Sequence, residues 1–179
     1  MSQFNVPLSE EKSVEAIVTG MNIVRAYQLG LKDFGTASVK EEDETLLTVV
    51  DRECGEVLRD SIRQHFPGVR NNIEDVEADE AQSNVTIYGD PIDGTLPFTV
   101  GLPTSTVILG AYDTKKREVL ACTIGEPISG RMWFTMDGRS YSGIWDYSDK
   151  VLCNKHTIKV WPGQLSRDTA VFLDTSQGF

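Results

Sequence analysis

The residues best suited to chemistry lie in one short segment, Asp90-Pro91-Ile92-Asp93-Gly94-Thr95. An apolar run at 85–88 precedes it, so Asp90 is expected where a buried strand meets a loop. Pro91 fixes φ and has no N–H, which stiffens the turn and lets Asp90 and Asp93 converge. Two carboxylates with no basic residue between them repel each other unless a cation lies there, and Mg²⁺ prefers such oxygen ligands.

The end of the same segment could hold an anion. Gly94 lets a ligand approach the backbone closely, and Thr95 offers a hydroxyl beside the carboxylates. If a short helix begins at Gly94–Thr95, its free N–H groups make a phosphate site. The alternative is an ordinary turn, because Asp-Pro and Asp-Gly are both common turn pairs.

The charge balance limits the classes of partner. The chain has 179 residues, with 17 Lys and Arg against 27 Asp and Glu, so its net charge is −10. Nucleic-acid backbones and anionic membranes attract basic patches, so neither is expected as the main partner. The acidic balance suits a divalent cation, although most acidic side chains on a soluble protein are simply solvated.

The cysteines and the N-terminus favour a cytoplasmic location. The chain has three cysteines, at positions 54, 122 and 153, an odd number without the spacing of a zinc site. We expect a reducing compartment and three small core residues. The N-terminus lacks the basic start and apolar run of a signal peptide, and no apolar stretch approaches the roughly 20 residues that span a bilayer.

Two amphipathic helices are expected first along the chain. Apolar spacing predicts one over 10–31, with Ser9 as its N-cap and Gly35 just past its end. Its buried face is expected to hold Val14, Ile17, Val18, Met21, Val24 and Leu31. The second is expected over about 51–65, and Thr48–Asp51 resembles a capping box at its start.

The pattern then changes to that of strands. Strands are expected at 85–88, 105–112, 118–125, 131–135, 139–141 and 168–173. Two helices followed by mainly antiparallel strands indicate an α+β fold. The length favours one domain, or one domain with a fragment of another.

Several ordered segments make the sequence similar to a known family. They are Asp90–Thr95, Thr48–Asp51 with the helix ending at His65-Phe66-Pro67, the hairpin at 105–125, Pro127–Gly130 with Trp133-Phe134, and Cys153-Asn154. This set resembles the inositol monophosphatase-like superfamily of Mg²⁺-dependent, lithium-sensitive phosphatases, from about residue 10 to 175. The resemblance implies two N-terminal helices packed on a mainly antiparallel sheet, as in the N-terminal half of the layered sugar-phosphatase fold.

The resemblance also implies roles for the residues of the Asp-Pro segment. Asp90 would bridge two metal ions, the Ile92 carbonyl would complete the first site, and Asp93 would ligate the second ion. Gly94 and Thr95 would hold the phosphate through backbone N–H groups. The Thr95 hydroxyl would help to activate the attacking water.

Two further acidic positions carry alternatives. Asp51 would support the attacking water or an outer metal by resemblance, and a purely helix-capping carboxylate is an equal alternative. The family's Gly-Glu-Glu, whose first Glu ligates a metal, falls in residues 72–77 here, without its glycine. The spacing of the monophosphatases gives Glu74 as the ligand. The spacing of the polyphosphate 1-phosphatases reaches Val76, one short of Glu77, which is the alternative.

A third family Asp belongs to a Trp-Asp motif in a C-terminal half. Trp145-Asp146 is such a pair, but it precedes the Cys-Asn segment and is interpreted as a surface turn. We therefore expect residues 1–165 to form the N-terminal metal-binding half, and 166–179 to begin a C-terminal half that is otherwise absent. Self-association or a partner half is then possible.

The implied function is Mg²⁺-dependent hydrolysis of a phosphomonoester by activated water, with two or more Mg²⁺ ions and inhibition by Li⁺. Short stretches at 140–147 and 101–103 look most like inositol polyphosphate 1-phosphatases. A 3′(2′),5′-bisphosphate nucleotidase is the enzymatic alternative, and a truncated non-catalytic metal-binding or assembly module is the other. His65 and His156 are expected to be structural, so no covalent phosphoenzyme is needed.

Overall fold

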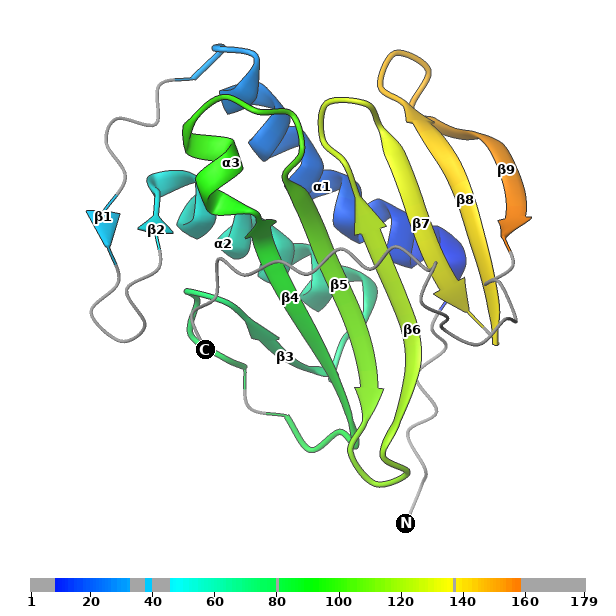
Figure 1. Ribbon diagram of the computed structural model, residues 1–179. Coiled ribbons are helices and arrows are strands. Elements are labelled where there is room, and N and C mark those ends of the chain that lie inside the picture. Colours follow the sequence, from blue (N-terminus) through cyan, green and yellow to red (C-terminus); the bar gives the residue numbers. More distant parts are fainter. Residues whose placement is uncertain (1–8, 33–37, 40–45, 80, 137, 159–179) are drawn as a thin grey trace, which may run out of the picture.

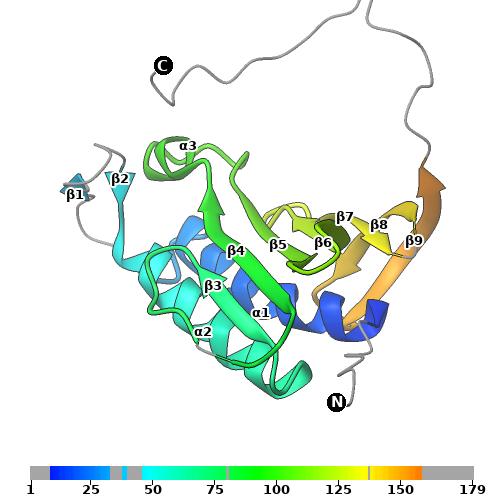
Figure 2. The same ribbon diagram turned by 90° about the horizontal axis from the view of Figure 1, so that it is seen from below.

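The computed structural model describes residues 9–32, 38–39, 46–79, 81–136 and 138–158. Within them, a seven-stranded sheet carries two long helices, α1 (Glu10–Gln28) and α2 (Val49–His65), on the same face (Figures 1 and 2). The strands follow chain order, β3 to β9, and every neighbouring pair is antiparallel except β3 and β4. This is the α+β architecture that the sequence predicted.

The strands of the large sheet have these bounds: β3 (Arg70–Ile73), β4 (Val85–Asp93), β5 (Thr106–Asp113), β6 (Glu118–Gly125), β7 (Arg131–Met136), β8 (Arg139–Asp146) and β9 (Val151–Ile158). A separate two-stranded antiparallel sheet pairs β1 (Ser38–Val39) with β2 (Leu46–Leu47). A short helix, α3 (Thr95–Thr99), follows β4 directly. No helix among the described residues is long and apolar enough to cross a membrane.

Helix α1 begins where the sequence predicted and ends earlier. The Ser9 hydroxyl accepts a hydrogen bond from the Lys12 amide at 3.3 Å, which confirms the N-cap. The helix stops at Gln28 because Gly30 adopts a φ of 69° and its neighbour Leu31 donates back to the Ala26 carbonyl at 2.9 Å. The prediction that Leu31 belongs to the buried face was therefore wrong, since its side chain is 74% exposed.

Helix α2 lies beside α1 on the sheet and packs against β3 and β4, whereas α1 packs against β5 and β6 (Figure 2). Its capping box is present: Thr48 accepts from the amides of the first turn, and the Asp51 carboxylate accepts from the Thr48 amide at 2.7 Å. The buried side of the helix includes Cys54, Leu58 and Ile62, all fully enclosed. Burial of this apolar face is the main stabilising contribution of the helix.

The strand predictions agree with the sheet in part. Both predicted hairpins are present, β5 with β6 and β7 with β8. Strand β4 continues through the Asp-Pro segment, well beyond the expected 85–88. Strands β3 and β9 were not expected, and the predicted strand at 168–173 lies outside the described residues. Cys153-Asn154, which the family resemblance implies to be a turn, lies inside β9 instead. Asn154 has a φ of 53° there, beside a register shift, so the pair is an irregularity of the strand.

Candidate functional site

The Asp-Pro segment forms the junction between β4 and α3. The pairing of β4 with β5 shifts its register between Asp90 and Asp93, so the strand leaves regular geometry there. The Ile92 amide donates to Asp90 Oδ1 at 3.0 Å, which holds the carboxylate against its own backbone. Gly94, with a φ of 87°, then turns the chain into α3. The short helix that the sequence allowed at Gly94–Thr95 is therefore present.

Asp51 reaches this junction from α2. Its Oδ2 accepts from the Thr48 hydroxyl at 2.6 Å, and its Oδ1 lies 3.4 Å from the Thr95 hydroxyl. The Thr95 hydroxyl also lies 3.1 Å from the Ile92 carbonyl oxygen. Because a hydroxyl has one proton, Thr95 donates to one of these two acceptors at a time. Asp51 therefore caps the helix and contacts the junction with separate oxygens.

Glu74 arrives beside Asp90 through the parallel pairing of β3 with β4. Ile73 is the register partner of Gly89 in this parallel pair. The residues that follow them, Glu74 and Asp90, therefore lie next to each other. The Glu74 amide donates to the Gly89 carbonyl at 2.9 Å, which fixes the start of the turn after β3. In that turn Asp75 has a φ of 61°.

Asp90 lies among several acidic side chains that raise its pKa. The pKa of Asp90 is raised to about 7, first by burial and then by the negative charges of Glu74, Asp93 and Asp51, while the hydrogen bond from the Ile92 amide opposes the rise. Asp51 also has a raised pKa, first because it is buried and only 4% exposed, and then because of the charge of Asp75. The carboxylates are thus close enough for one to resist the ionisation of another.

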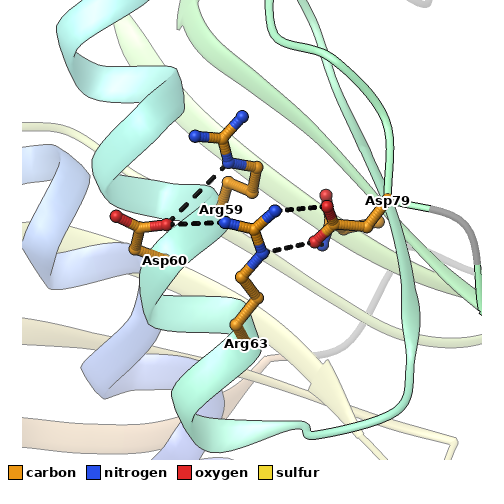
Figure 3. A network of polar contacts seen from close by, with 5 residues as sticks. Arg59, Asp60, Arg63 and Asp79 are labelled. Carbon is orange, nitrogen blue, oxygen red and sulfur yellow. Dashed lines mark hydrogen bonds and ion pairs between the residues drawn. The ribbon is translucent and has the colours of Figure 1, made fainter.

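Asp79, later in the same acidic segment, is tied to α2. Glu77 is exposed. Asp79 accepts from the Arg63 guanidinium through both carboxylate oxygens (Figure 3). It also accepts from the Asn71 side-chain amide at 2.7 Å. Asp60 adds a contact with the same guanidinium. This network anchors the acidic segment at Asp79, and the turn at Glu74 begins the segment.

A buried thiol supports the Asp-Pro turn. The Cys54 Sγ lies 3.5 Å from the Pro91 carbonyl, to which it donates. Burial raises the pKa of this thiol well above its usual value, and the charges of Asp51 and Asp90 raise it further. The sequence identified Cys54 only as a core residue. Its place three residues after Asp51, on the same side of the helix, was the signal for a contact with this site.

The donor set fits a hard divalent cation in its chemistry. Asp90, Asp93 and Glu74 offer carboxylate oxygens and Ile92 offers a carbonyl, which are ligand types of Mg²⁺. Among the described residues, no three acidic, His or Cys side chains converge closely enough to hold a metal as they stand. The pKa of Asp90 nevertheless responds to its acidic neighbours. Both statements hold, because charge acts over a longer distance than a metal–oxygen bond of about 2.1 Å.

Three residues discussed from the sequence lie elsewhere. Asp146 accepts from the amides of Ser148 and Asp149 at 2.8 and 3.1 Å, which makes it the cap of the turn after β8. His65 lies 3.4 Å from a Glu15 carboxylate oxygen, and exposed His156 lies 2.9 Å from the Asn154 carbonyl. None of the three meets the β4–α3 junction.

Comparisons with known proteins agree with the fold. The family model described as "Inositol monophosphatase family" matches residues 10–170. A search of curated protein sequences found no significant match.

Solved structures share the fold at low sequence identity. The extragenic suppressor protein suhB of Bartonella henselae has a TM-score of 0.65 and 19% identity over 76% of this chain and 51% of its own. An IMPase of Thermotoga maritima has a TM-score of 0.62 and 21% identity over 75% and 50%. A staphylococcal IMPase I, complexed with products, has a TM-score of 0.59 and 15% identity over 75% and 51%. The chain therefore spans about half the length of the structures it matches.

Proposed function

Since the chain belongs to the inositol monophosphatase family, we propose that it serves the Mg²⁺-dependent hydrolysis of a phosphate monoester. The observation that carries the proposal is the meeting of three separate elements at one place. Helix α2 brings Asp51, the turn after β3 brings Glu74, and β4 brings Asp90. The chain spans about half the length of its structural relatives. We therefore propose, rather than report, the activity of the whole protein.

Four residues would hold the metal ions. Asp90 would bridge two ions, with Glu74 and the Ile92 carbonyl at the first and Asp93 at the second. Glu74 is preferred to Glu77 because its charge acts on Asp90, whereas the charges that raise the pKa of Asp90 do not include Glu77. When Mg²⁺ is bound, it lowers the pKa of a coordinated water and neutralises charge on the leaving oxygen.

Asp51 and Thr95 would orient the attacking water. When the Thr95 hydroxyl donates to Asp51 Oδ1, its oxygen is free to accept a hydrogen bond from water. The same choice leaves the Ile92 carbonyl, 3.1 Å away, available to a cation. Glu74 would take the water proton, and the amides of Gly94 and Thr95 would hold the phosphate. The short α3 places those amides at the junction.

The substrate we favour is an inositol phosphate of the kind cleaved by inositol polyphosphate 1-phosphatases. The stretches at 140–147 and 101–103 support this choice. A 3′(2′),5′-bisphosphate nucleotide is the alternative substrate. We also propose a cytoplasmic protein inhibited by Li⁺, in which residues 1–165 form the metal-binding half. The third Asp ligand would then come from a second half, either of the same protein or of a partner.

Phosphate release tests the proposal. The 179-residue chain is assayed on inositol 1-phosphate, inositol 1,4-bisphosphate and adenosine 3′,5′-bisphosphate, with Mg²⁺ and with EDTA. We expect Mg²⁺-dependent release that is lost in Asp90→Asn and kept in the matched control Asp146→Asn. No release from any of the three esters, with Mg²⁺ binding that Asp90→Asn leaves unchanged, would favour the non-catalytic module instead.

A further inference from the structure

Helix α2 has a glycine where two acidic segments, the turn after β3 and the end of β4, pack against it. Gly55 is buried, and a Cβ built on it would lie 2.5 Å from Val76 Cγ2. The same Cβ would lie 3.3 Å from Pro91 Cγ and 3.4 Å from the Glu74 carbonyl oxygen. The turn that carries Glu74 and the strand that carries Asp90 therefore both rest on the bare backbone of one helical residue.

We propose that Gly55 is a positioning residue of the metal site: its missing side chain sets the distance between Glu74, Asp90 and Asp51. Gly55 follows Asp51 by four residues, so both lie on the same face of α2. The face that supplies the Asp51 carboxylate is thus the face on which the other two acidic segments pack. The role of this distance in binding metal rests on the proposed function. The distance itself rests on packing alone.

The neighbours of Gly55 cannot give way without moving the site. Val76 is β-branched, so its χ1 is stiff, and it packs against the core. Its amide bonds the Ile73 carbonyl at 3.2 Å, and the Glu74 amide bonds Gly89 at 2.9 Å, so the turn is held at both ends. A side chain at position 55 must displace this turn, and Glu74 with it, or the helix, and Asp51 with it.

The helix itself gains nothing from a glycine. Glycine is a poor helix former, and alanine would favour α2 at this position. Its presence in the middle of a buried helix is explained by the close approach of the two acidic segments.

Amide hydrogen exchange on the metal-free chain tests the positioning directly. In Gly55→Ala we expect the Glu74 amide hydrogen to exchange at least about tenfold faster than in the wild type, because the hydrogen bond from this amide to the Gly89 carbonyl is disturbed. Val76→Ala removes the closest atom, so Gly55→Ala/Val76→Ala should return the Glu74 amide to within about threefold of the wild-type rate. Val76→Ala alone should stay in that same range.

Gly20→Ala is the matched control, because its Cβ crowds α2 from the α1 side, 2.8 Å from Leu58 Cδ2. It should leave the Glu74 amide unchanged. The inference is overturned if Gly55→Ala leaves this amide at the wild-type rate, if Val76→Ala does not reverse the loss, or if Gly20→Ala reproduces it. Should Gly55→Ala not fold, the double variant decides: wild-type protection of Glu74 supports the inference, and failure to fold contradicts it.

Titration with Mn²⁺ alone separates this inference from the proposed function. Gly55→Ala should bind Mn²⁺ about tenfold more weakly than the wild type, and the double variant should recover to within about threefold. A wild-type chain that does not bind Mn²⁺ would contradict the proposed function. The exchange rates would still decide whether Gly55 sets the distance between the acidic segments.

Discussion

The Oδ1 atom of Asp51 lies 3.4 Å from the hydroxyl oxygen of Thr95, across 44 positions of sequence. Its Oδ2 atom accepts from the amide and the hydroxyl of Thr48, at 2.7 and 2.6 Å. One carboxylate therefore begins helix α2 and also contacts the β4–α3 junction. The sequence left capping and catalytic support as alternatives for Asp51; the cap is confirmed, and the support of a water stays a proposal.

Loss of the Asp51 carboxylate should cost stability through the cap. Asp51→Ala leaves the buried amide and hydroxyl of Thr48 without their acceptor, so we expect the free energy of unfolding to fall by about 1–2 kcal/mol. Urea unfolding without metal measures it. Thr95→Val keeps the cap and removes the hydroxyl that contacts Asp51 and the Ile92 carbonyl, so it should cost less than half as much. An equal loss in both variants would place the stabilisation in the contacts of the Thr95 hydroxyl and not in the cap.

The Asp90 carboxyl should make the metal-free chain less stable as the pH rises. Its pKa is about 7 in the folded chain against an ordinary value of 3.8, so the folded state binds the proton more tightly than the unfolded state. Stability contributed by the protonated carboxyl is fully present below pH 3.8 and is lost progressively up to about pH 7. Above that pH, Asp90→Asn should be more stable than the wild type.

The measurement is urea unfolding in EDTA at pH values from about 4 to 8. The advantage of Asp90→Asn should grow across this range and level off near the top of it. Asp146→Asn, at an exposed turn, supplies the comparison. An advantage that is the same at both ends of the range would show that Asp90 does not titrate between them.

Gly94 should tolerate asparagine better than alanine. Its φ of 87° is a left-handed conformation, and a Cβ there would meet only ordinary contacts, Pro97 Cγ at 3.6 Å and Ser105 Cα at 3.7 Å. The cost of Gly94→Ala is therefore conformational, and we expect about 1–2 kcal/mol from thermal or urea unfolding. Gly94→Asn should cost less, since asparagine enters this region more readily. Equal costs would point to a steric clash instead.

Local signals predicted much of the fold. Ser9 and Thr48 cap their helices through bonds that span three residues, so short-range sequence suffices to place both helix starts. The end of α1 was misjudged because Gly30 ended it before Gly35 could, which left Leu31 in solvent. Strand β3 was missed because its sequence, Arg-Asn-Asn-Ile, is short and polar, and its place beside β4 depends on tertiary pairing.

The site was only partly accessible from sequence. The Asp-Pro segment announces itself by residue type, and the turn into α3 follows from Gly94. The approach of Asp51 and Glu74 to that segment depends on how α2 and β3 pack, which no local pattern encodes. The support from Cys54 and the bare backbone at Gly55 are packing relationships of the same kind. Residues on one side of α2 were visible in the sequence, but the segments that cover them were not.

Binding of Mn²⁺ to the metal-free chain, followed by titration, tests the central claim that Asp90 is the principal ligand of a cation site. We expect saturable binding to the wild type and to Asp146→Asn, and binding at least about tenfold weaker to Asp90→Asn. Because Asp90→Asn also removes the charge repulsion with Glu74 and Asp93, its folded state should be intact at neutral pH. Equal affinities of the wild type and Asp90→Asn would contradict the account.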